Sequence, residues 1–334
     1  MLTNMDVFIE LLQLIFRSGL PACLLAIGIF LTFKILDFAD MTAEGSFLVS
    51  GAVCAVCIIK GMSPIIATLL GVAAGGACGF VTGFLNRVLK IPKLLSGIIT
   101  MTAAGSVALL IFGVTSGDSL FKASVSLSGK DTIFSILDPA IFKGWNMVIM
   151  MLAVVIIAFL IIYFFFGTEY GMAIRATGMN ENMAKAQGIN TTISTIACVA
   201  ISNAIIGLAG ALYAQSEKGM YATSATGYLI VGLASILIGE AVFGNRSFIN
   251  SLISVCLGSL LYFTIVNVAT FIFNMPTELN KILYAVLITF ALCIPSIKKL
   301  FKFKRKKFPD LPSKKDILFV EETISENADK VEVD

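Results

Sequence analysis

Long apolar stretches alternate with short polar connections along almost the whole of this 334-residue chain. A helix of about 20 apolar residues spans the hydrocarbon core of a bilayer, which is ~30 Å thick. The pattern therefore predicts an all-α fold, a polytopic membrane helix bundle of about nine (eight to ten) transmembrane helices. The nine predicted crossings are residues 18–36, 45–60, 62–86, 94–114, 145–167, 191–216, 225–243, 249–273 and 282–297.

The first 17 residues leave this count open. Apolar side chains from Val7 to Phe16 stand between the charged residues Asp6 and Arg17. This arrangement fits a helix that lies in the membrane interface. If the segment crosses the membrane instead, the number of crossings becomes ten.

Composition narrows the classes of function. Only 13% of the residues are charged, whereas soluble proteins carry about 25%. This excludes a water-soluble enzyme and a nucleic-acid-binding protein, which needs an exposed basic face. The chain has no histidine, and its seven cysteines all lie in apolar runs, including Cys54 and Cys57, which we interpret as packing residues. We therefore predict no catalytic, cofactor-binding or metal-binding residue.

Basic residues set the expected orientation, because Lys and Arg next to membrane helices are retained on the cytoplasmic side. Seven of them crowd into residues 298–307, directly after the last predicted crossing. Counting crossings backwards assigns sixteen basic residues to the cytoplasmic side and seven to the other side. We therefore expect a multi-pass protein of the plasma (inner) membrane, with a transmembrane domain over residues 1–300. Residues 301–334 would form a cytoplasmic tail, first basic and then acidic.

One predicted crossing carries a stripe of glycines at helical spacing, Gly71, Gly75, Gly79 and Gly83. Residues four apart share a helix face, so this face has no side chains. Such a face lets another helix approach closely, and close packing drives helix association in lipid. We interpret the stripe as a static packing contact rather than as a surface that slides during transport.

The connection at residues 168–190 is too polar to lie in the membrane and too short to form a domain. Asn180 is suited to cap a short helix from Glu181 to about Gln187, which Gly188 would end. A second short helix is expected from Tyr170 to Thr177, broken at the next glycine. Two short helices joined in this way make a compact projection. Docking to a partner is its functional interpretation, and an ordinary solvated connection is the plainer one.

This connection resembles the coupling loop of ABC importer permeases of the branched-chain amino acid and ribose type. That family carries a pattern close to G-x-x-x-R-A-x-G-x-N-P-x-A-A-x-x-x-G-I. The chain departs from the pattern at Glu181, where the family usually has Pro, and at Met183, where Ala is common. Pro at a first helical position is helpful but replaceable. The matching residues are Gly171, Arg175, Ala176, Gly178, Asn180, Ala184, Gly188 and Ile189.

Two further segments are similar to the same family. Residues 36–55, LDFADMTAEGSFLVSGAVCA, resemble the start of an early crossing, and residues 232–261 resemble a late segment punctuated by glycines. The resemblance covers about residues 30–300. It is nearest to uncharacterised permeases predicted to carry aromatic amino acids.

The resemblance implies a permease subunit that forms the membrane pathway for a small solute, most simply an amino acid. Three protein partners are implied: a cytoplasmic ABC ATPase, an extracytoplasmic substrate-binding protein and a second permease subunit, most simply an identical copy. ATP would be bound by the partner ATPase, because this chain has no G-x-x-x-x-G-K-[ST] pattern. We therefore expect no cofactor and no enzymatic activity in the chain itself. The implied ATPase-coupling residues are Glu169, Gly171, Arg175, Ala176, Gly178, Asn180, Glu181, Ala184 and Gly188.

Glu240 keeps a second class of function open, because apolar residues flank it on both sides in ILIGEAVFG. It could bind a proton in a proton-coupled secondary transporter, or pair with Arg246 at the inner surface. Secondary transporters usually place ionisable residues near the bilayer midplane, and we find no other such residue within the predicted crossings. We therefore favour the ABC permease and rank an intramembrane enzyme last, since the acid–base equipment is missing. The sequence does not identify the solute or the residues along its pathway.

Overall fold

The structure is a computed structural model and describes residues 4–114, 122–135, 145–273, 286 and 289. Seven of the described helices are long and apolar enough to cross a membrane, which confirms a polytopic helical membrane protein. The chain divides into two compact units, Met1–Ala291 and Leu292–Asp334, and every described residue belongs to the first. The predicted crossing at 282–297 and the predicted tail at 301–334 lie outside the described residues, apart from two isolated positions.

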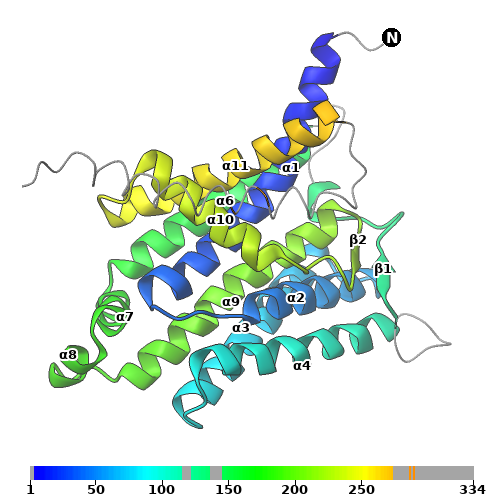
Figure 1. Ribbon diagram of the computed structural model, residues 1–334. Coiled ribbons are helices and arrows are strands. Elements are labelled where there is room, and N and C mark those ends of the chain that lie inside the picture. Colours follow the sequence, from blue (N-terminus) through cyan, green and yellow to red (C-terminus); the bar gives the residue numbers. More distant parts are fainter. Residues whose placement is uncertain (1–3, 115–121, 136–144, 274–285, 287–288, 290–334) are drawn as a thin grey trace, which may run out of the picture. The chain divides into compact units, whose positions relative to one another are not determined.

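Helices make up most of the described chain (Figure 1). Short strands β1 (Ser124–Ser126) and β2 (Gly219–Tyr221) pair antiparallel, with Val125 opposite Met220. Except for α1, the long helices begin within three residues of their predicted starts. In chain order, the helices are α1 (Asn4–Phe30), the π-helix η1 (Leu31–Ile35), α2 (Thr42–Ile59), α3 (Pro64–Arg87), α4 (Lys93–Gly113), the 3₁₀ turn η2 (Ile133–Ser135), α6 (Asn146–Phe166), α7 (Glu169–Met179), α8 (Glu181–Ala186), α9 (Thr191–Ser216), α10 (Tyr228–Phe243) and α11 (Phe248–Phe273).

Helix α1 differs from the prediction, because the first residues do not form a separate interfacial helix. Residues 4–30 are one continuous helix, so the N-terminal segment extends the first crossing and adds no further one. The charge of Arg17 is accommodated inside this helix by two contacts. Its guanidinium lies 3.3 Å from the carboxylate of Glu217 and donates to the carbonyl oxygen of Ser216.

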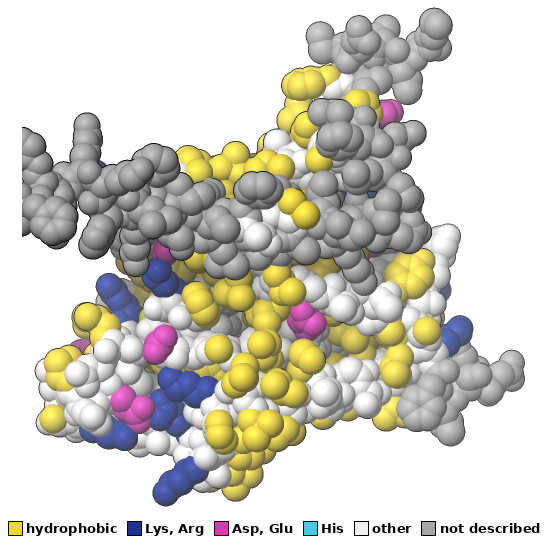
Figure 2. Space-filling view, viewed as in Figure 1, with side chains coloured by type: hydrophobic (Ala, Val, Ile, Leu, Met, Phe, Trp, Pro, Cys, Tyr) yellow, Lys and Arg dark blue, Asp and Glu magenta, His cyan; other side chains and the backbone are white. Residues whose placement is uncertain are grey.

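Helices α1, α2 and α9 form the centre of the bundle. In the most apolar 18-residue stretch of each of these helices, 78%, 78% and 61% of the residues are buried, compared with 28% in both α4 and α6. The outer helices therefore keep most of their apolar side chains on the surface, as expected of helices that contact lipid or another subunit. Figure 2 shows these apolar side chains over α4.

The glycine stripe of α3 lies against α9 and α2. A Cβ atom added to Gly75 would lie 2.6 Å from the carbonyl oxygen of Asn203, and one added to Gly79 would lie 2.5 Å from that of Val199. Gly71 and Gly83 face Ala211 and Ile196 of α9 in the same way. Side chains at these positions would push the two helices apart.

Candidate functional site

Residues 168–190, which include α7 and α8, form a projection that we call the knob. Three polar side chains start its helices and the following α9 by capping them. Thr168 Oγ1 accepts from the amide of Gly171 at 3.3 Å, Asn180 Oδ1 accepts from Met183 at 3.0 Å, and Asn190 Oδ1 accepts from Ile193 at 3.2 Å. The knob follows α6 and precedes α9, so it lies at the end of α9 opposite the β1–β2 pair (Figure 1).

The predicted break at Gly178 is wrong, because α7 continues through this residue to Met179. The break falls at Asn180, whose backbone is extended. Gly178 serves a packing purpose instead: a Cβ atom there would collide with the carbonyl group of Ile35 at the end of η1. Gly171 likewise touches the backbone of Phe165 and Phe166 at the end of α6. The two glycines therefore let α7 rest directly on two other elements.

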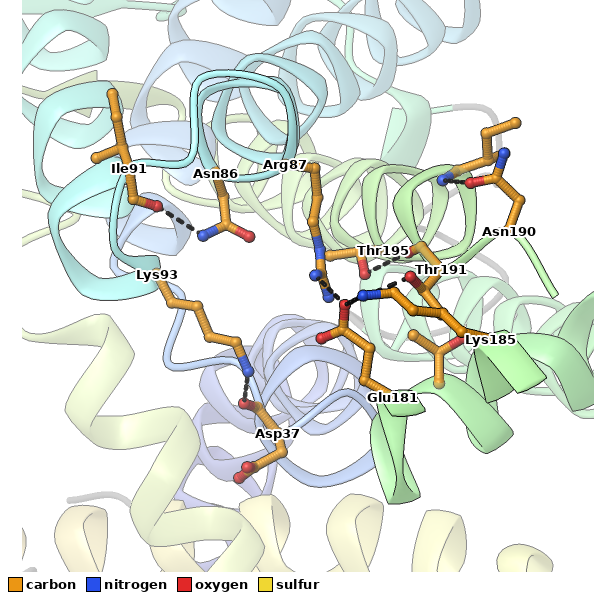
Figure 3. Close-up of polar contacts among 12 residues, drawn as sticks. Asp37, Asn86, Arg87, Ile91, Lys93, Glu181, Lys185, Asn190, Thr191 and Thr195 are labelled. Atoms are coloured by element: carbon orange, nitrogen blue, oxygen red, sulfur yellow. Dashed lines mark hydrogen bonds and ion pairs between the residues drawn. The ribbon is translucent and has the colours of Figure 1, made fainter. Parts of the chain in front are cut away.

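Glu181 anchors the knob to the end of α3 (Figure 3). Its Oε1 atom accepts from the guanidinium of Arg87 at 2.8 Å and from the ammonium of Lys185 at 2.9 Å. Thr191, the first residue of α9, adds a hydroxyl contact at 3.4 Å. The hydrogen bond from Lys185, together with Arg87, lowers the pKa of Glu181 to about 2. Glu181, one of the two residues that depart from the family pattern, thus joins α8, α3 and α9.

The remaining predicted coupling residues are divided between the interior and the surface of the knob. Ala184 is completely buried, and Gly188 has a φ angle of +82°, which favours glycine. Arg175 lies 5.2 Å from the ring centre of Phe248 at the start of α11, a cation–π contact. Glu169 is exposed in the first turn of α7, whereas Ala176 is half-buried. The structure therefore gives most of these residues a role in holding the knob in place.

The surface of the knob carries large apolar side chains. Tyr170 is 80% exposed, Met179 85%, Met172 53% and Met183 45%. These residues belong to the polar connection rather than to a predicted crossing. Exposed methionine and aromatic side chains are typical of surfaces that bind a partner.

Glu240 pairs with Lys34 of η1 at 2.9 Å and not with Arg246. Its carboxylate is mostly shielded from solvent, and the Oε1 atom has no hydrogen-bond partner in the described structure. The pair joins the last turn of α10 to the end of the first crossing. Sequence reasoning missed Lys34 because the two residues are 206 positions apart.

A buried polar network at the start of α2 was also missed. Asp40, 6% exposed, accepts from the amide of Thr42 at 2.9 Å and from Asn203 Nδ2 at 2.6 Å. Asn203 Oδ1 in turn accepts from the hydroxyl of Ser46 at 2.7 Å. The available signal was an acidic residue, Asp40, in the short connection between the predicted crossings at 18–36 and 45–60.

Comparison with known proteins supplies the family. Residues 11–292 match the sequence model of a family that is described as "Branched-chain amino acid transport system / permease component". A tyrosine transport system permease protein of Clostridioides difficile is 32% identical over 305 residues, which cover 91% of this chain and 98% of that protein. No solved structure matches the chain.

Two further relatives carry names with other solutes. The galactofuranose transporter permease protein of Escherichia coli is 27% identical over 84% of this chain and 78% of its own length. A probable branched-chain amino acid transport permease protein of Methanocaldococcus jannaschii is 27% identical over 69% of this chain and 72% of its own length. These relatives are permease components and not enzymes. The chain therefore belongs to the family of branched-chain amino acid transport system permease components, which are multi-pass membrane subunits of ABC transporters.

Proposed function

We propose that this chain is the permease subunit of an ABC importer for an amino acid, driven by a separate cytoplasmic ATPase that docks on the knob. The exposed apolar side chains of Tyr170, Met172, Met179 and Met183 carry this proposal. A polar connection has no reason to present such side chains to water unless a partner covers them. The anchoring contacts of Gly178 and Glu181 make the knob a rigid unit that can transmit the movement of its partner.

The proposed topology has nine crossings. The seven long helices and α10 account for eight of them, and residues 282–297 supply the ninth. The knob and the basic segment at 298–307 then lie on the cytoplasmic side of the plasma (inner) membrane, and the β1–β2 pair lies outside. In this arrangement the loops around β1 and β2 receive a substrate-binding protein, and a second copy of the chain completes the pathway. ATP binds only to the ATPase partner.

An aromatic amino acid is the solute that we propose. The relative named for tyrosine transport matches along nearly the whole of both chains, whereas the relative named for galactofuranose is less similar. Specificity in such importers also depends on the binding protein, so the solute must be measured.

The experiment is a pull-down of the full-length chain in mild detergent through a C-terminal tag, followed by mass spectrometry. We expect a stoichiometric ATPase that bears a Walker motif, and we expect the double variant Tyr170→Ala with Met179→Ala to lose it. The matched control is Ile157→Ala with Ile161→Ala, which removes exposed apolar side chains from α6 instead. Recovery of the permease without an ATPase, from a preparation that remains folded and active, would refute the proposal. That outcome would favour the proton-coupled transporter and Glu240.

A further inference from the structure

Glu44 is a charged residue at the middle depth of the helix bundle. Two positions further along α2, Ser46 bonds to Asn203, which stands at the middle of the 26-residue α9. Two residues correspond to about 3 Å along a helix axis, so Glu44 lies close to the same depth. A carboxylate at this depth is costly in lipid and marks a functional pathway by default.

The side chain of Glu44 is only half-buried, unlike that of Asp40 on the preceding loop. Its neighbour Gly45 packs against Met101 and Ala104 of α4, and Glu44 itself contacts Gly227 directly before α10, so this face of the bundle lies where α2 meets α4 and α10 (Figure 1). None of the ion pairs among the described residues involves Glu44. This face therefore borders an aqueous pathway or a second subunit rather than lipid.

Helix α10 begins inside the bundle next to this carboxylate. The helix has 16 residues, which span ~24 Å and fall short of the ~30 Å hydrocarbon core. Glu44 Oε1 accepts from the amide of Gly227, the residue that precedes α10, at 3.0 Å. Interrupted helices that begin at mid-depth are a known way of building a solute site in a transporter.

Three aromatic rings pack against one another beside the start of α10. Phe47, one turn after Glu44 on α2, stacks on Tyr228 with 4.8 Å between ring centres. Tyr213 of α9 packs edge-on against Tyr228 at 5.7 Å. Phe47 is buried, and both tyrosines are half-buried like Glu44. Aromatic rings beside a carboxylate favour organic cations, because the carboxylate is negatively charged and the face of each ring has a negative electrostatic potential.

We propose that Glu44, Tyr213 and Tyr228 form a contact site in the transport pathway that recognises the ammonium group of an amino acid. The ammonium donates to the carboxylate of Glu44, whose two oxygens keep acceptor capacity beyond the backbone hydrogen bonds from Gly227 and Leu229. An apolar or aromatic side chain of the solute then packs on the tyrosine rings. This inference rests on the proposed function, since it needs the face of α2, α4 and α10 to border the pathway.

The test measures binding of soluble probes to the full-length chain in lipid nanodiscs, by saturation-transfer NMR. The probes are L-phenylalanine, phenethylamine, which keeps the ammonium, and 3-phenylpropanoate, which lacks it. We expect the wild-type chain to bind the two ammonium probes about tenfold or more tightly than 3-phenylpropanoate. Glu44→Gln keeps an acceptor for the Gly227 amide and removes the charge, so it should abolish this preference. The matched control, Glu217→Gln, alters an exposed carboxylate paired with Arg17 and should keep it.

A second variant protects the test against misfolding of Glu44→Gln. Tyr213→Leu removes a ring and leaves the carboxylate, and we expect it to weaken binding of both ammonium probes severalfold while their preference over 3-phenylpropanoate persists. A wild-type chain without the preference, or a folded Glu44→Gln variant that retains it, would overturn the inference. If the ATPase is recovered with the chain and the probes show no preference, the pathway site fails while the importer assignment stands.

Discussion

Two carboxylates that contact α9, those of Glu181 and Asp40, are stabilised in different ways. Glu181 in the knob accepts from two cations, Arg87 and Lys185, at the edge of the bundle. Asp40 in the core accepts from a backbone amide and from Asn203, and no ion pair of the described residues includes it. Long basic side chains reach a carboxylate easily where water is near, but a dry core supplies only short, neutral donors.

The difference indicates how movement of the knob reaches the membrane core. Thr191 at the start of α9 touches Glu181, and Asn203 at its middle holds Asp40. Helix α9 therefore connects the partly solvated ion pairs of the knob to the buried hydrogen bonds of the core. We infer that a displaced knob shifts α9 as a body and that the core contacts set the limit of the shift.

The largest expected effect comes from removing the hydrogen bond between Asn203 and Asp40 in the core. Asn203→Leu removes the amide donor from the buried carboxylate of Asp40, which costs about 3 kcal/mol or more. Thermal unfolding in detergent, followed by the loss of monodisperse protein, measures it. The control Asn86→Leu removes one bond to the carbonyl of Ile91 at the end of α3 and should cost about 1 kcal/mol. Equal losses for the two variants would contradict the difference between core and edge.

A smaller effect is expected from the glycine contacts beside Asn203. Gly75→Ala forces a methyl group to within 2.6 Å of the Asn203 carbonyl, so we expect a loss of about 1–3 kcal/mol in unfolding free energy. Gly105→Ala on α4 is the matched control, because no atom lies within 4 Å of its added Cβ. That variant should be neutral or slightly more stable. A stable Gly75→Ala variant would show that α3 and α9 pack less closely than described.

At the knob, Arg87→Ala should lower stability by only about 0.5–1 kcal/mol, because the pair is partly solvated. Solute uptake at equal membrane abundance should nevertheless fall, since the knob loses its tie to α3. Exchanging the charges, with Arg87→Glu and Glu181→Arg together, should restore part of the uptake. Failure of the exchange, with the protein folded, would remove Glu181 from the anchoring role.

The same ion pairs determine the pH response of the knob. The pKa of Glu181 is lowered from 4.5 to about 2 in the folded protein, so its stabilising effect is present above pH 4.5 and disappears as pH falls through 2. We therefore expect Glu181→Gln to reduce uptake equally at pH 6 and pH 8. An effect that changes between these values would point to another titrating group.

The smallest effect is expected at Glu240. Glu240→Gln weakens the pair with Lys34 but keeps a hydrogen-bond acceptor, so uptake should change less than about twofold. Uptake measured from pH 5.5 to 8 should keep its wild-type profile. Complete loss of pH-dependent uptake would instead support a proton-coupled transporter.

The sequence predicted what depends on neighbouring residues. Apolar stretches located the starts of the long helices after α1 to within three residues, and Asn180 predicted the start of α8. The sequence could not predict contacts between residues that are far apart along the chain. Glu181 and Arg87 are 94 positions apart, and Asp40 and Asn203 are 163 positions apart. Gly178 was misread because a helix-ending glycine and a packing glycine look alike until the neighbouring η1 is known. Glu44 was not singled out because its depth depends on the contact between Ser46 and Asn203, which are 157 positions apart.

The most direct test of the central claim is site-specific photocrosslinking from the knob in intact cells. A photoreactive residue placed at Met179 or Met183, on the exposed surface of the knob, should crosslink to a separate ATPase. The same residue at Ile157 on the apolar face of α6 should not. Crosslinks to an ATPase from Met179 and Met183 alone are the predicted result. Crosslinks that involve only lipid or this chain, while solute uptake continues, would contradict the account.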